Sequence, residues 1–365
     1  MFIRNISLIN WRNYAECSVD FDSGLNVIRG ENAQGKTNLL EAVHYLAVGR
    51  GFRAGRDGDL IADSADSALA AATVATVDRD IELRAELRRG ARRRLFVGGS
   101  TAKTAGEFAG RLRAVLFAPG DLELVSGAPA DRRKFLDDAL CQLRPRYAEA
   151  LAQYTRLHRH KTRILRDGED DPSLLGALDA FNERMARVGA VMIGYRARFI
   201  RGLSAHAPAL HADMSGGRET LGLRYQTSSR VTDPFASENT VADELYAHLC
   251  ERKQAEIASG MTLVGPHRDE LAIEIDGRPS QTHASQGQTR TAALALKLAE
   301  RQLFLEDSGE NPVLLLDDVL SELDDARRRW VLGFTGSGQV LITLCDGGNF
   351  GEARVFTVCG GQIDN

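Results

Sequence analysis

The chain has 365 residues, of which 43% are hydrophobic and 26% charged, and its formal net charge is -4. This composition is typical of an ordinary globular protein, so it excludes a disordered or fibrous chain. The small acidic excess excludes a protein-wide basic surface, so any contact with nucleic acid has to come from local patches.

Membrane attachment and disulfide bonds are not expected. No stretch approaches the 18 apolar residues of a membrane helix, and the N-terminus lacks the apolar core of a signal peptide. The five cysteines are odd in number and contain no CxxC pair, which favours reduced, buried thiols. We therefore expect a cytoplasmic protein.

The N-terminal part is expected to be rich in strands. Alternating apolar residues predict three short strands, over residues 2–9, 18–21 and 24–28. The third strand runs into a glycine-rich turn and then an apolar helix over residues 36–47. Further alternation between residues 68 and 97 predicts an antiparallel meander beside that turn.

From residue 131 the apolar spacing becomes helical. It predicts two long antiparallel helices, over residues 131–166 and 173–211, with a strand over 221–226 and a helix over 238–259 after them. The α/β pattern then returns with a strand, a helix and two more strands, over residues 271–275, 285–305, 312–316 and 339–344. The middle of the chain is therefore expected to be an inserted, mostly helical lobe.

The turn after the third strand carries a complete phosphate-loop pattern. It reads Gly30-Glu31-Asn32-Ala33-Gln34-Gly35-Lys36-Thr37 and fits GxxxxGK[ST] at every fixed position. Glycines let successive N–H groups point at phosphate oxygens, and the following helix adds its positive dipole end. In this pattern Lys36 neutralises the outer phosphates and Thr37 offers its hydroxyl to Mg²⁺. A chance glycine-rich turn is the alternative, and the strand before and helix after it argue against that.

An apolar strand at residues 313–316 ends in Asp317 and Asp318, as expected for the second element of a phosphate site. Asp317 is predicted to hold Mg²⁺ with Thr37, and Asp318 to act in catalysis by orienting the attacking water. A buried strand that meets an acidic turn is the alternative. The pairing with the phosphate loop favours the functional interpretation.

A second phosphate-binding helix start is predicted at Ser285, Gln286, Gly287 and Gln288. The two helix starts of one chain are not expected to bind the same nucleotide without a second chain. Two chains arranged head to tail would sandwich each ATP between Lys36 of one chain and Ser285 of the other. Alone, these residues are also compatible with a plain helix N-cap.

Seven segments in this order resemble the ATP-binding-cassette ATPases and, more narrowly, the RecF family of bacterial recombination mediators, which is related to the heads of SMC proteins. They are Trp11–Tyr14, Gly30–Thr37, Gly49–Arg53, Asp131–Asp137, Gly265–Asp269, Ser285–Arg290 and Leu316–Asp324. The resemblance implies an α/β ATPase head with a mixed sheet, a meander and the helical lobe. The domains would be an N-terminal ATPase part at 1–125, the lobe at 126–255 and a C-terminal ATPase part at 256–365.

The resemblance also assigns roles to further residues. It implies a D-loop that crosses a dimer interface, made of Ser321, Glu322, Leu323 and Asp324. Residues 118–121 would be the Q-loop, with Gly120 where the family usually has an acid. Asp318 is one methylene shorter than the Glu of most cassettes, and no switch histidine follows the strand at 340–344. These departures predict slow turnover.

The function implied is that of an ATP-dependent DNA-binding protein with ATP and Mg²⁺ as cofactors. ATP would close a homodimer on DNA at gaps or junctions, and a weak, DNA-dependent ATPase activity would release it. RecR and RecO would be its direct partners and RecA an indirect one. The implied setting is recombinational repair, replication restart and SOS induction.

Two local basic patches are candidates for DNA contact. One is a hairpin that includes Arg92, Arg93 and Arg94, and the other is a helix that includes Arg159, Lys161 and Arg163. A polar turn and a solvated helical face are the respective alternatives. His267 and Arg268 follow a Gly-Pro turn and fit either a role at the nucleotide or interface or a structural turn.

Two other functions were weighed. The nucleotide-binding subunit of a membrane transporter is disfavoured by the large helical insertion and the missing switch histidine. A chromosome-organising head needs a coiled coil of hundreds of residues between the motifs, and the chain between Lys36 and Ser285 is too short for one.

Overall fold

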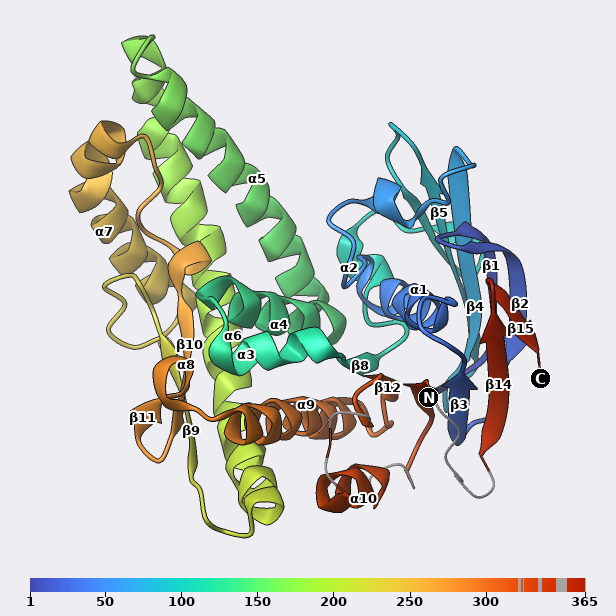
Figure 1. Cartoon of the computed structure of the whole chain (residues 1–365). Coiled ribbons are helices and arrows are strands. Elements are labelled where there is room, and N and C mark those ends of the chain that lie inside the picture. Colours follow the sequence, from blue (N-terminus) through green and yellow to red (C-terminus); the bar gives the residue numbers. More distant parts are fainter. Residues whose placement is uncertain (321–322, 324, 334–336, 346–352, 365) are drawn as a thin grey trace. The chain divides into compact units, whose positions relative to one another are not determined.

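The computed structural model describes residues 1–320, 323, 325–333, 337–345 and 353–364 (Figure 1). The chain divides into two compact units. Unit 1 comprises residues 1–121 and 294–365, and unit 2 comprises residues 122–293. The fold is mixed α/β with a helical lobe, which confirms the predicted fold class.

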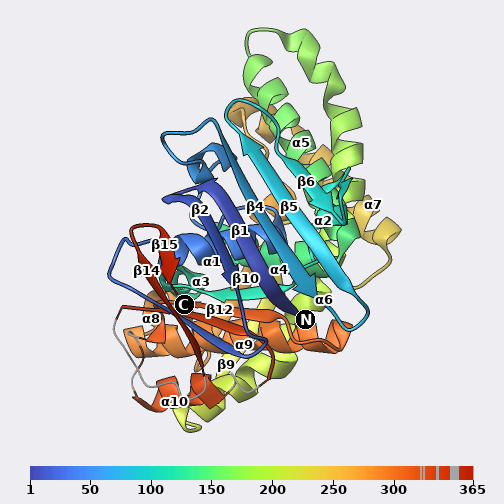
Figure 2. The ribbon, with the colours of Figure 1, turned by 90° about the vertical axis from the view of Figure 1, so that its right-hand side faces the viewer.

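Unit 1 contains an antiparallel sheet in the order β2-β1-β4-β5-β6-β7 (Figure 2). Its strands are β1 (Phe2–Trp11), β2 (Tyr14–Asp20), β4 (Ser67–Ala75), β5 (Asp80–Arg88), β6 (Arg94–Val97) and β7 (Ser100–Thr101). In β4 and β5 buried and solvent-facing residues largely alternate, as the two-residue repeat of a half-buried strand requires. The predicted meander is therefore confirmed.

The second sheet of unit 1 has the order β15-β14-β3-β13-β12-β8, and all its pairs are parallel except that of β14 with β15. Its strands are β3 (Leu25–Arg29), β8 (Ala114–Phe117), β12 (Val313–Asp317), β13 (Val340–Leu344), β14 (Arg354–Cys359) and β15 (Gln362–Asp364). β3, β12 and β13 lie next to one another, so their carboxyl ends meet at one edge. Ligands bind at that edge in open α/β sheets.

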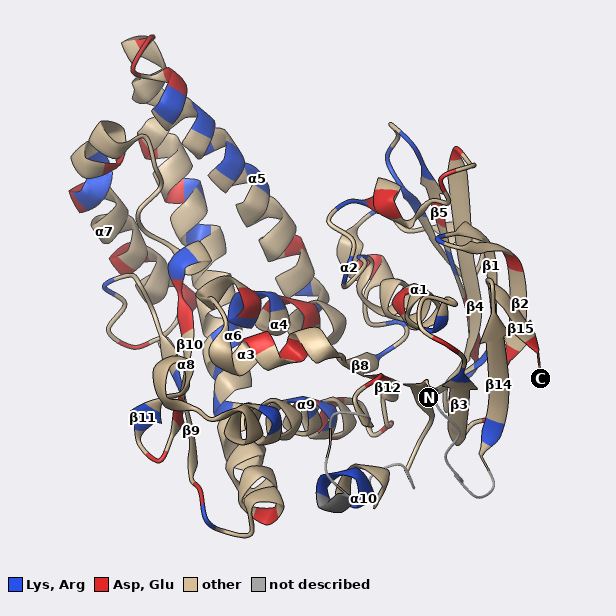
Figure 3. Cartoon of the chain, viewed as in Figure 1, with Lys and Arg blue, Asp and Glu red and all other residues tan. Residues whose placement is uncertain are grey.

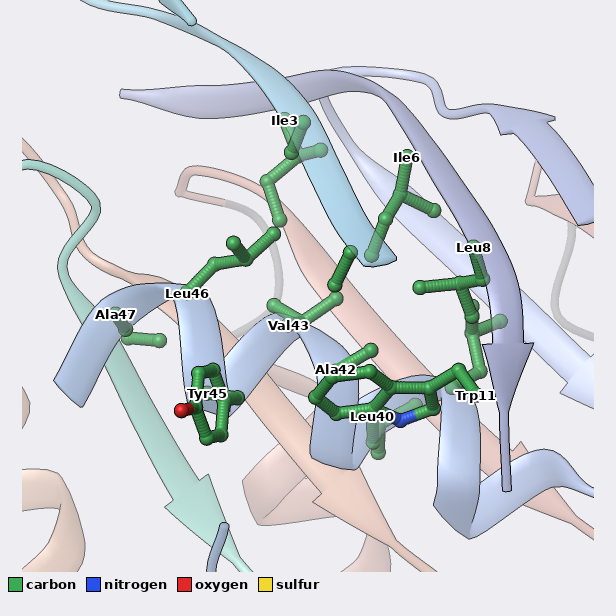
Figure 4. Close-up of a cluster of buried hydrophobic side chains, with 14 of the residues drawn as sticks. Ile3, Ile6, Leu8, Trp11, Leu40, Ala42, Val43, Tyr45, Leu46 and Ala47 are labelled. Carbon is green, nitrogen blue, oxygen red and sulfur yellow. The ribbon is translucent and has the colours of Figure 1, made fainter. Parts of the chain in front are cut away.

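Helix α1 (Lys36–Val48) supplies the core of unit 1 between the two sheets (Figure 4). Eleven of its residues are buried, so the helix is enclosed nearly all round. Val43 and Leu46 belong to the same buried cluster as Ile3 of β1. Trp11 meets Tyr45 edge to face, with ring centroids 5.4 Å apart. The same cluster includes Leu315 and Leu341 from the second sheet. The start of α1 is thus held rigidly. Two further helices of unit 1 are α2 (Ala105–Phe108) and α10 (Asp325–Gly333).

Unit 2 is mostly helical, with α3 (Glu123–Ser126), α4 (Pro129–Leu143), α5 (Pro145–Asp167), α6 (Leu178–Ser215) and α7 (Glu238–Ser259). α6 packs against both α5 and α7. The single helix predicted over 131–166 is wrong, since the structure has α4 and α5 there. Pro145 lacks an N–H and forces Arg144 into an extended conformation, so it ends one helix and begins the next.

A small antiparallel sheet completes unit 2 in the order β11-β10-β9, with β9 (Leu221–Gln226), β10 (Glu270–Ile275) and β11 (Arg278–Pro279). The short helix α8 (Ser280–His283) follows, and Ser280 donates to the carbonyl of Val125 at 2.8 Å. Residues 256–293 therefore group with the lobe, whereas the predicted boundary put them in the ATPase domain. The pairing of β10 with β9, which precedes α7 in the chain, draws them there.

Helix α9 (Gln286–Ser308) begins in unit 2 and continues into unit 1. None of the described helices is both long enough and apolar enough to cross a membrane. The five cysteines are free thiols, as expected, but Cys250 and Cys359 are exposed. Cys359 adjoins the β14–β15 turn and Cys250 lies on the outer side of α7, so the expectation that all five are buried is wrong.

Candidate nucleotide site

The predicted phosphate loop joins β3 to α1 at the carboxyl edge of the parallel sheet. Ala33 and Gly35 adopt left-handed conformations, with φ of 64° and 124°. A Cβ at position 35 would lie 2.8 Å from Asn13 Nδ2, so the loop requires glycine there. No side chain caps the start of α1. Its first N–H groups therefore suit an anionic ligand.

Lys36 folds back over this loop. Its Nζ donates to the carbonyl oxygens of Gly30 and Glu31, the second at 2.8 Å, and lies 3.6 Å from the Cys345 sulfur. The ammonium is thus held inside the turn, where the outer phosphates of a nucleotide would lie. This placement fits the role predicted for Lys36.

Thr37 and Asp317 meet directly, although they are 280 residues apart in sequence. Thr37 Oγ1 donates to Asp317 Oδ1 at 2.8 Å, and Thr343 Oγ1 donates to the same oxygen at 2.8 Å. Burial raises the pKa of Asp317, and the two hydroxyl donors act against that rise. A hydroxyl and a carboxylate oxygen in contact are ligands that Mg²⁺ accepts, with phosphate oxygens and water completing its shell.

Within the described part of the chain, no cluster of three or more His, Cys, Asp or Glu side chains is arranged to hold a metal ion. Mg²⁺ at this site would therefore depend on Thr37, Asp317 and the ligand together. This dependence is normal for Mg²⁺, which seldom occupies an all-protein cage.

Asp318 follows in a left-handed conformation, with φ of 51°. Its backbone N–H donates to Thr343 Oγ1 at 2.9 Å. The Cys345 sulfur lies 3.9 and 4.0 Å from its carboxylate oxygens and also donates to Asn32 Oδ1 at 2.9 Å. A non-glycine residue in this conformation is strained, and such strain concentrates at functional sites. Asp318 thus lies beside the phosphate loop, where a water-orienting carboxylate is needed.

The structure also reveals a support for the loop that sequence reasoning did not assign. Asn13 Nδ2 donates to the carbonyl of Gln34 at 2.8 Å, and Tyr14 Oη donates to the carbonyl of Gly35 at 3.0 Å. From the C-terminal hairpin, Gly361 N donates to the Gln34 carbonyl at 3.1 Å. The segment Trp11–Tyr14 carries part of the family resemblance, and these contacts give it a structural role.

A buried carboxylate links two more of the resemblance segments. Glu41 of α1 accepts from Arg12 at 2.8 and 3.0 Å. Its other oxygen accepts from the backbone N–H groups of Arg53 and Ala54 at 2.9 and 3.1 Å. The Glu41 side chain is fully buried, so these four hydrogen bonds take the place of the water molecules that would otherwise solvate its carboxylate. Residues 11–14 and 49–53 therefore converge on the helix that follows the phosphate loop.

The second predicted phosphate-binding helix start lies in unit 2. Ser285 Oγ accepts from Gln288 N at 3.2 Å, and Gln288 Oε1 accepts from Ser285 N at 2.9 Å. This reciprocal pair is a capping box, so the N-cap interpretation is correct for the chain by itself. Ser285, Gln286 and Gly287 are exposed, and their contact with a second chain stays a prediction.

Two other predicted segments are less informative. Of the D-loop, Ser321, Glu322 and Asp324 lie outside the described residues, and Leu323 is buried. In the Q-loop segment, Gly120 is exposed and Asp121 Oδ2 accepts from the Ala118 N–H at 2.7 Å. The acid of this segment thus closes its own turn.

Figure 3 shows where basic and acidic residues lie along the chain, and the two basic patches differ in how far their charges are already paired. On the hairpin, Arg92, Arg93 and Arg94 are all exposed. Arg93 lies 3.3 Å from Asp57 and Arg94 lies 3.2 Å from Glu86. On α5, Arg159 and Arg163 are exposed, and Arg163 pairs with Asp167 at 3.1 Å.

Lys161 does not belong to either patch, so its assignment to DNA contact is wrong. Its side chain is fully buried and pairs with Glu256 of α7 at 2.6 Å. Burial lowers the pKa of Lys161, and Glu256 acts in the opposite direction. The apolar face of α5 carries Lys161 inward, because it lies one helical turn after Leu157 and one before Leu165, both buried.

The phosphate loop joins β3 to α1, and Asp317 and Asp318 lie at the carboxyl end of β12, which is two strands from β3 in the sheet. This arrangement defines an ATPase head of the ATP-binding-cassette type. The family described as RecF/RecN/SMC N terminal domain matches residues 2–354. The chain belongs to this family and, within it, to the RecF proteins.

Curated relatives and solved structures agree on that membership. The DNA replication and repair protein RecF of Gloeobacter violaceus is 43% identical over 91% of this chain and 88% of its own. That of Symbiobacterium thermophilum is 41% identical over 95% and 92%. A structure of the recombination mediator protein RecF-ATPrS in the RecFOR pathway is 32% identical, covers 100% of this chain and 97% of its own, and has a TM-score of 0.93. An Smc head domain of Pyrococcus furiosus, 17% identical over 99% of this chain and 95% of its own with a TM-score of 0.56, shares the fold.

Proposed function

We propose that the chain binds ATP with Mg²⁺ and uses it to close a homodimer on DNA, and that hydrolysis releases the dimer. The contact between Thr37 and Asp317 at 2.8 Å carries this proposal, since it joins the two halves of a nucleotide–metal site. The RecF structures solved as RecF-ATP and RecF-ATPrS support the choice of nucleotide.

Each residue of the site then has a definite task. The amides at the start of α1 and the Lys36 ammonium bind phosphate oxygens. Thr37 and Asp317 hold Mg²⁺, which when bound neutralises charge on those oxygens. Asp318 accepts a hydrogen bond from the attacking water and orients it. Ser285 of the second chain would complete the site from the far side of the nucleotide.

Turnover is expected to be slow. Asp318 is held by its backbone to Thr343, and its side chain is one methylene shorter than Glu, so its carboxylate reaches less far toward a water molecule. We therefore infer a weak, DNA-dependent ATPase in which ATP acts mainly as a conformational switch. Such an enzyme keeps its closed state long enough for partners to bind.

DNA contact is best supported on α5. Arg156, Arg159, Arg163 and Arg166 are exposed at spacings of three, four and three residues, which places them on one stripe. Of these four, Arg163 forms an ion pair with Asp167 at 3.1 Å. The hairpin arginines are more extensively paired and rank second.

The partners and setting follow from family membership. RecR and RecO would bind directly and RecA would be loaded as a result, at DNA gaps during recombinational repair, replication restart and SOS induction. The RecFOR pathway named for the solved RecF structures supports this setting over the transporter alternative. The protein would be located in the cytoplasm.

Mixing two inactive variants tests the shared site. Ser285→Arg and Asp318→Asn should each abolish ATPase activity, because each homodimer carries the defect in both sites. In a hybrid dimer one site collects both changes, and the other pairs an intact Asp318 with an intact Ser285 and should hydrolyse ATP. Asp318→Asn spares nucleotide binding, whereas Lys36→Met, the control, should remove it. No recovery, with hybrid dimers shown to be present, would contradict the sandwich.

A further inference from the structure

Unit 2 contains an open pocket of about 640 Å³ that the nucleotide site does not use. It lies between the first turn of α4, the middle of α5 and the loop before β10. Four of its lining residues carry nitrogen side chains, namely Arg133, His158, His267 and Arg268. Its volume falls within the range of small-ligand sites, roughly 300–1,000 Å³.

The turn that carries His267 and Arg268 is held from several sides. Gly265 has φ of 132°, and a Cβ there would lie 2.2 Å from Tyr154 Oη, so only glycine fits. Arg196, itself buried, donates to the Pro266 carbonyl at 2.6 Å. Asp269 is buried, and its carboxylate accepts hydrogen bonds from Ser228 N at 2.9 Å and from Tyr225 Oη. Such support fixes side chains to the precision that a binding site needs.

Inside this turn the imidazole of His267 is fully engaged. Its Nδ1 is 2.8 Å from Tyr154 Oη and its Nε2 is 3.3 Å from the Thr262 carbonyl, so Nε2–H donates and Nδ1 accepts. The Thr262 carbonyl also accepts from Arg268 Nε at 3.0 Å. His267 therefore positions the loop, and Arg268, held through its Nε, lines the pocket.

Positive charge dominates the pocket. None of the described residues that line it is acidic. The nearby acids are already engaged, since Glu256 pairs with Lys161, Glu270 with Arg132, and Asp131 accepts from the Ala128 N–H. Burial lowers the pKa of His267 to about 3, with His158, Arg268 and Arg133 adding to the effect. Burial, Lys161 and Arg268 lower that of His158.

We propose that this pocket binds a phosphomonoester group. Arg133 and Arg268 would provide charge-assisted hydrogen bonds to its oxygens, and His158, 4.3 Å from His267 between ring centroids, would gain a proton and provide a third. A phosphomonoester carries a charge of about -1.5 to -2 at neutral pH, which these groups match. The start of α4 adds a favourable dipole.

Two sources would supply the same chemistry, a small phosphorylated molecule and the terminal phosphate of a DNA strand. The pocket belongs to unit 2 and the phosphate loop to unit 1, so this proposal stands apart from ATP binding. Histidine resonances report on the pocket directly, independently of ATPase activity.

The test follows the pKa of His158 in the full chain with ¹³C-labelled histidine, using His158→Gln to assign its resonance. Inorganic phosphate should raise that pKa saturably, and a chloride salt of equal ionic strength should not. Arg268→Gln and Arg133→Gln should each weaken the phosphate effect at least tenfold. Arg187→Gln, an exposed arginine on α6 paired with Glu183, is the matched control and should leave it unchanged. Lys36→Met should also leave it unchanged.

A short duplex with 5′-phosphate ends and the same duplex with 5′-hydroxyl ends separate the two sources. Half-saturation at a concentration at least tenfold lower for the phosphorylated duplex identifies a DNA end, and equal concentrations identify a small molecule. The proposal is overturned if phosphate moves the His158 resonance no more than chloride does. It is also overturned if both arginine variants, shown to be folded by circular dichroism, respond to phosphate like the parent chain.

Discussion

The exposed arginine stripe on α5 makes a quantitative prediction about DNA affinity. Its four members, Arg156, Arg159, Arg163 and Arg166, extend over ten residues, or about 15 Å at the helical rise of roughly 1.5 Å per residue. Each phosphate contact with B-form DNA contributes about -0.9 to the slope of log affinity against log salt. Replacing all four with Gln should therefore make the slope shallower by up to about 3.6.

Arg163 lowers that expectation slightly because it already pairs with Asp167 at 3.1 Å. If Asp167 retains it, three contacts remain and the change is about 2.7. The slope is measured by fluorescence anisotropy with duplex DNA and saturating ATP over a series of salt concentrations. Gln is chosen because it keeps a long, helix-compatible side chain and removes only the charge.

The hairpin provides the comparison for this experiment. Replacing Arg92, Arg93 and Arg94 with Gln removes a similar amount of charge from the other patch. An unchanged slope in the α5 variant would refute the assignment of DNA to that helix. A shallower slope in the hairpin variant alone would move the DNA surface to β5 and β6.

Three further predictions concern stability and the phosphate loop. Lys161→Met should lower the free energy of unfolding, measured in urea, by about 3–5 kcal/mol, because it leaves the buried Glu256 carboxylate without its ion-pair partner. Adding Glu256→Gln removes that charge and keeps the oxygen that accepts from the Leu263 N–H, so the double variant should recover much of the loss. A larger loss in the double variant would contradict this. Between about pH 6.5 and 3 the His267 imidazole is protonated in the unfolded state only, so its contribution to the free energy of unfolding should fall by about 1.4 kcal/mol per pH unit as pH drops. His267→Gln should make the measured pH dependence shallower by that amount, and an identical pH profile would refute it. Asn13→Ala removes the hydrogen bond to the Gln34 carbonyl of the loop and the one that Asn13 accepts from Asn38 of α1. It should raise the Kd for ATP about tenfold, measured by calorimetry, with unchanged circular dichroism; an unchanged Kd would mean that Gly361 and Tyr14 suffice.

Where local signals were strong, the sequence predicted elements well. The helix predicted over 238–259 has these bounds in the structure, because the Ser237 side chain caps its start and Gly260 ends it in a left-handed conformation. The strand predicted over 221–226 is likewise confirmed. The phosphate loop is recognisable because all its fixed positions fall within one short, uninterrupted segment, Gly30–Thr37.

The supports of the site were not predictable in the same way. Asn13, Tyr14 and Gly361 reach the loop from positions far away in sequence, and no local pattern records such contacts. Lys161 is a different case, since its spacing from Leu157 and Leu165 put it on the apolar stripe of α5. That signal was present in the sequence and outweighs the basic composition around it.

The supports of the loop bear on how ATP would act. A peptide group is planar, so its carbonyl and N–H point in opposite directions. Asn13 and Gly361 hold the Gln34 carbonyl, and Tyr14 holds that of Gly35, so the N–H groups of Gly35 and Lys36 point away from these residues. Because the fold itself orders the loop, nucleotide binding does not have to supply the roughly 1–2 kcal/mol per residue that ordering costs. More of the binding free energy of ATP is then available to join two chains, as an ATP-gated dimer requires.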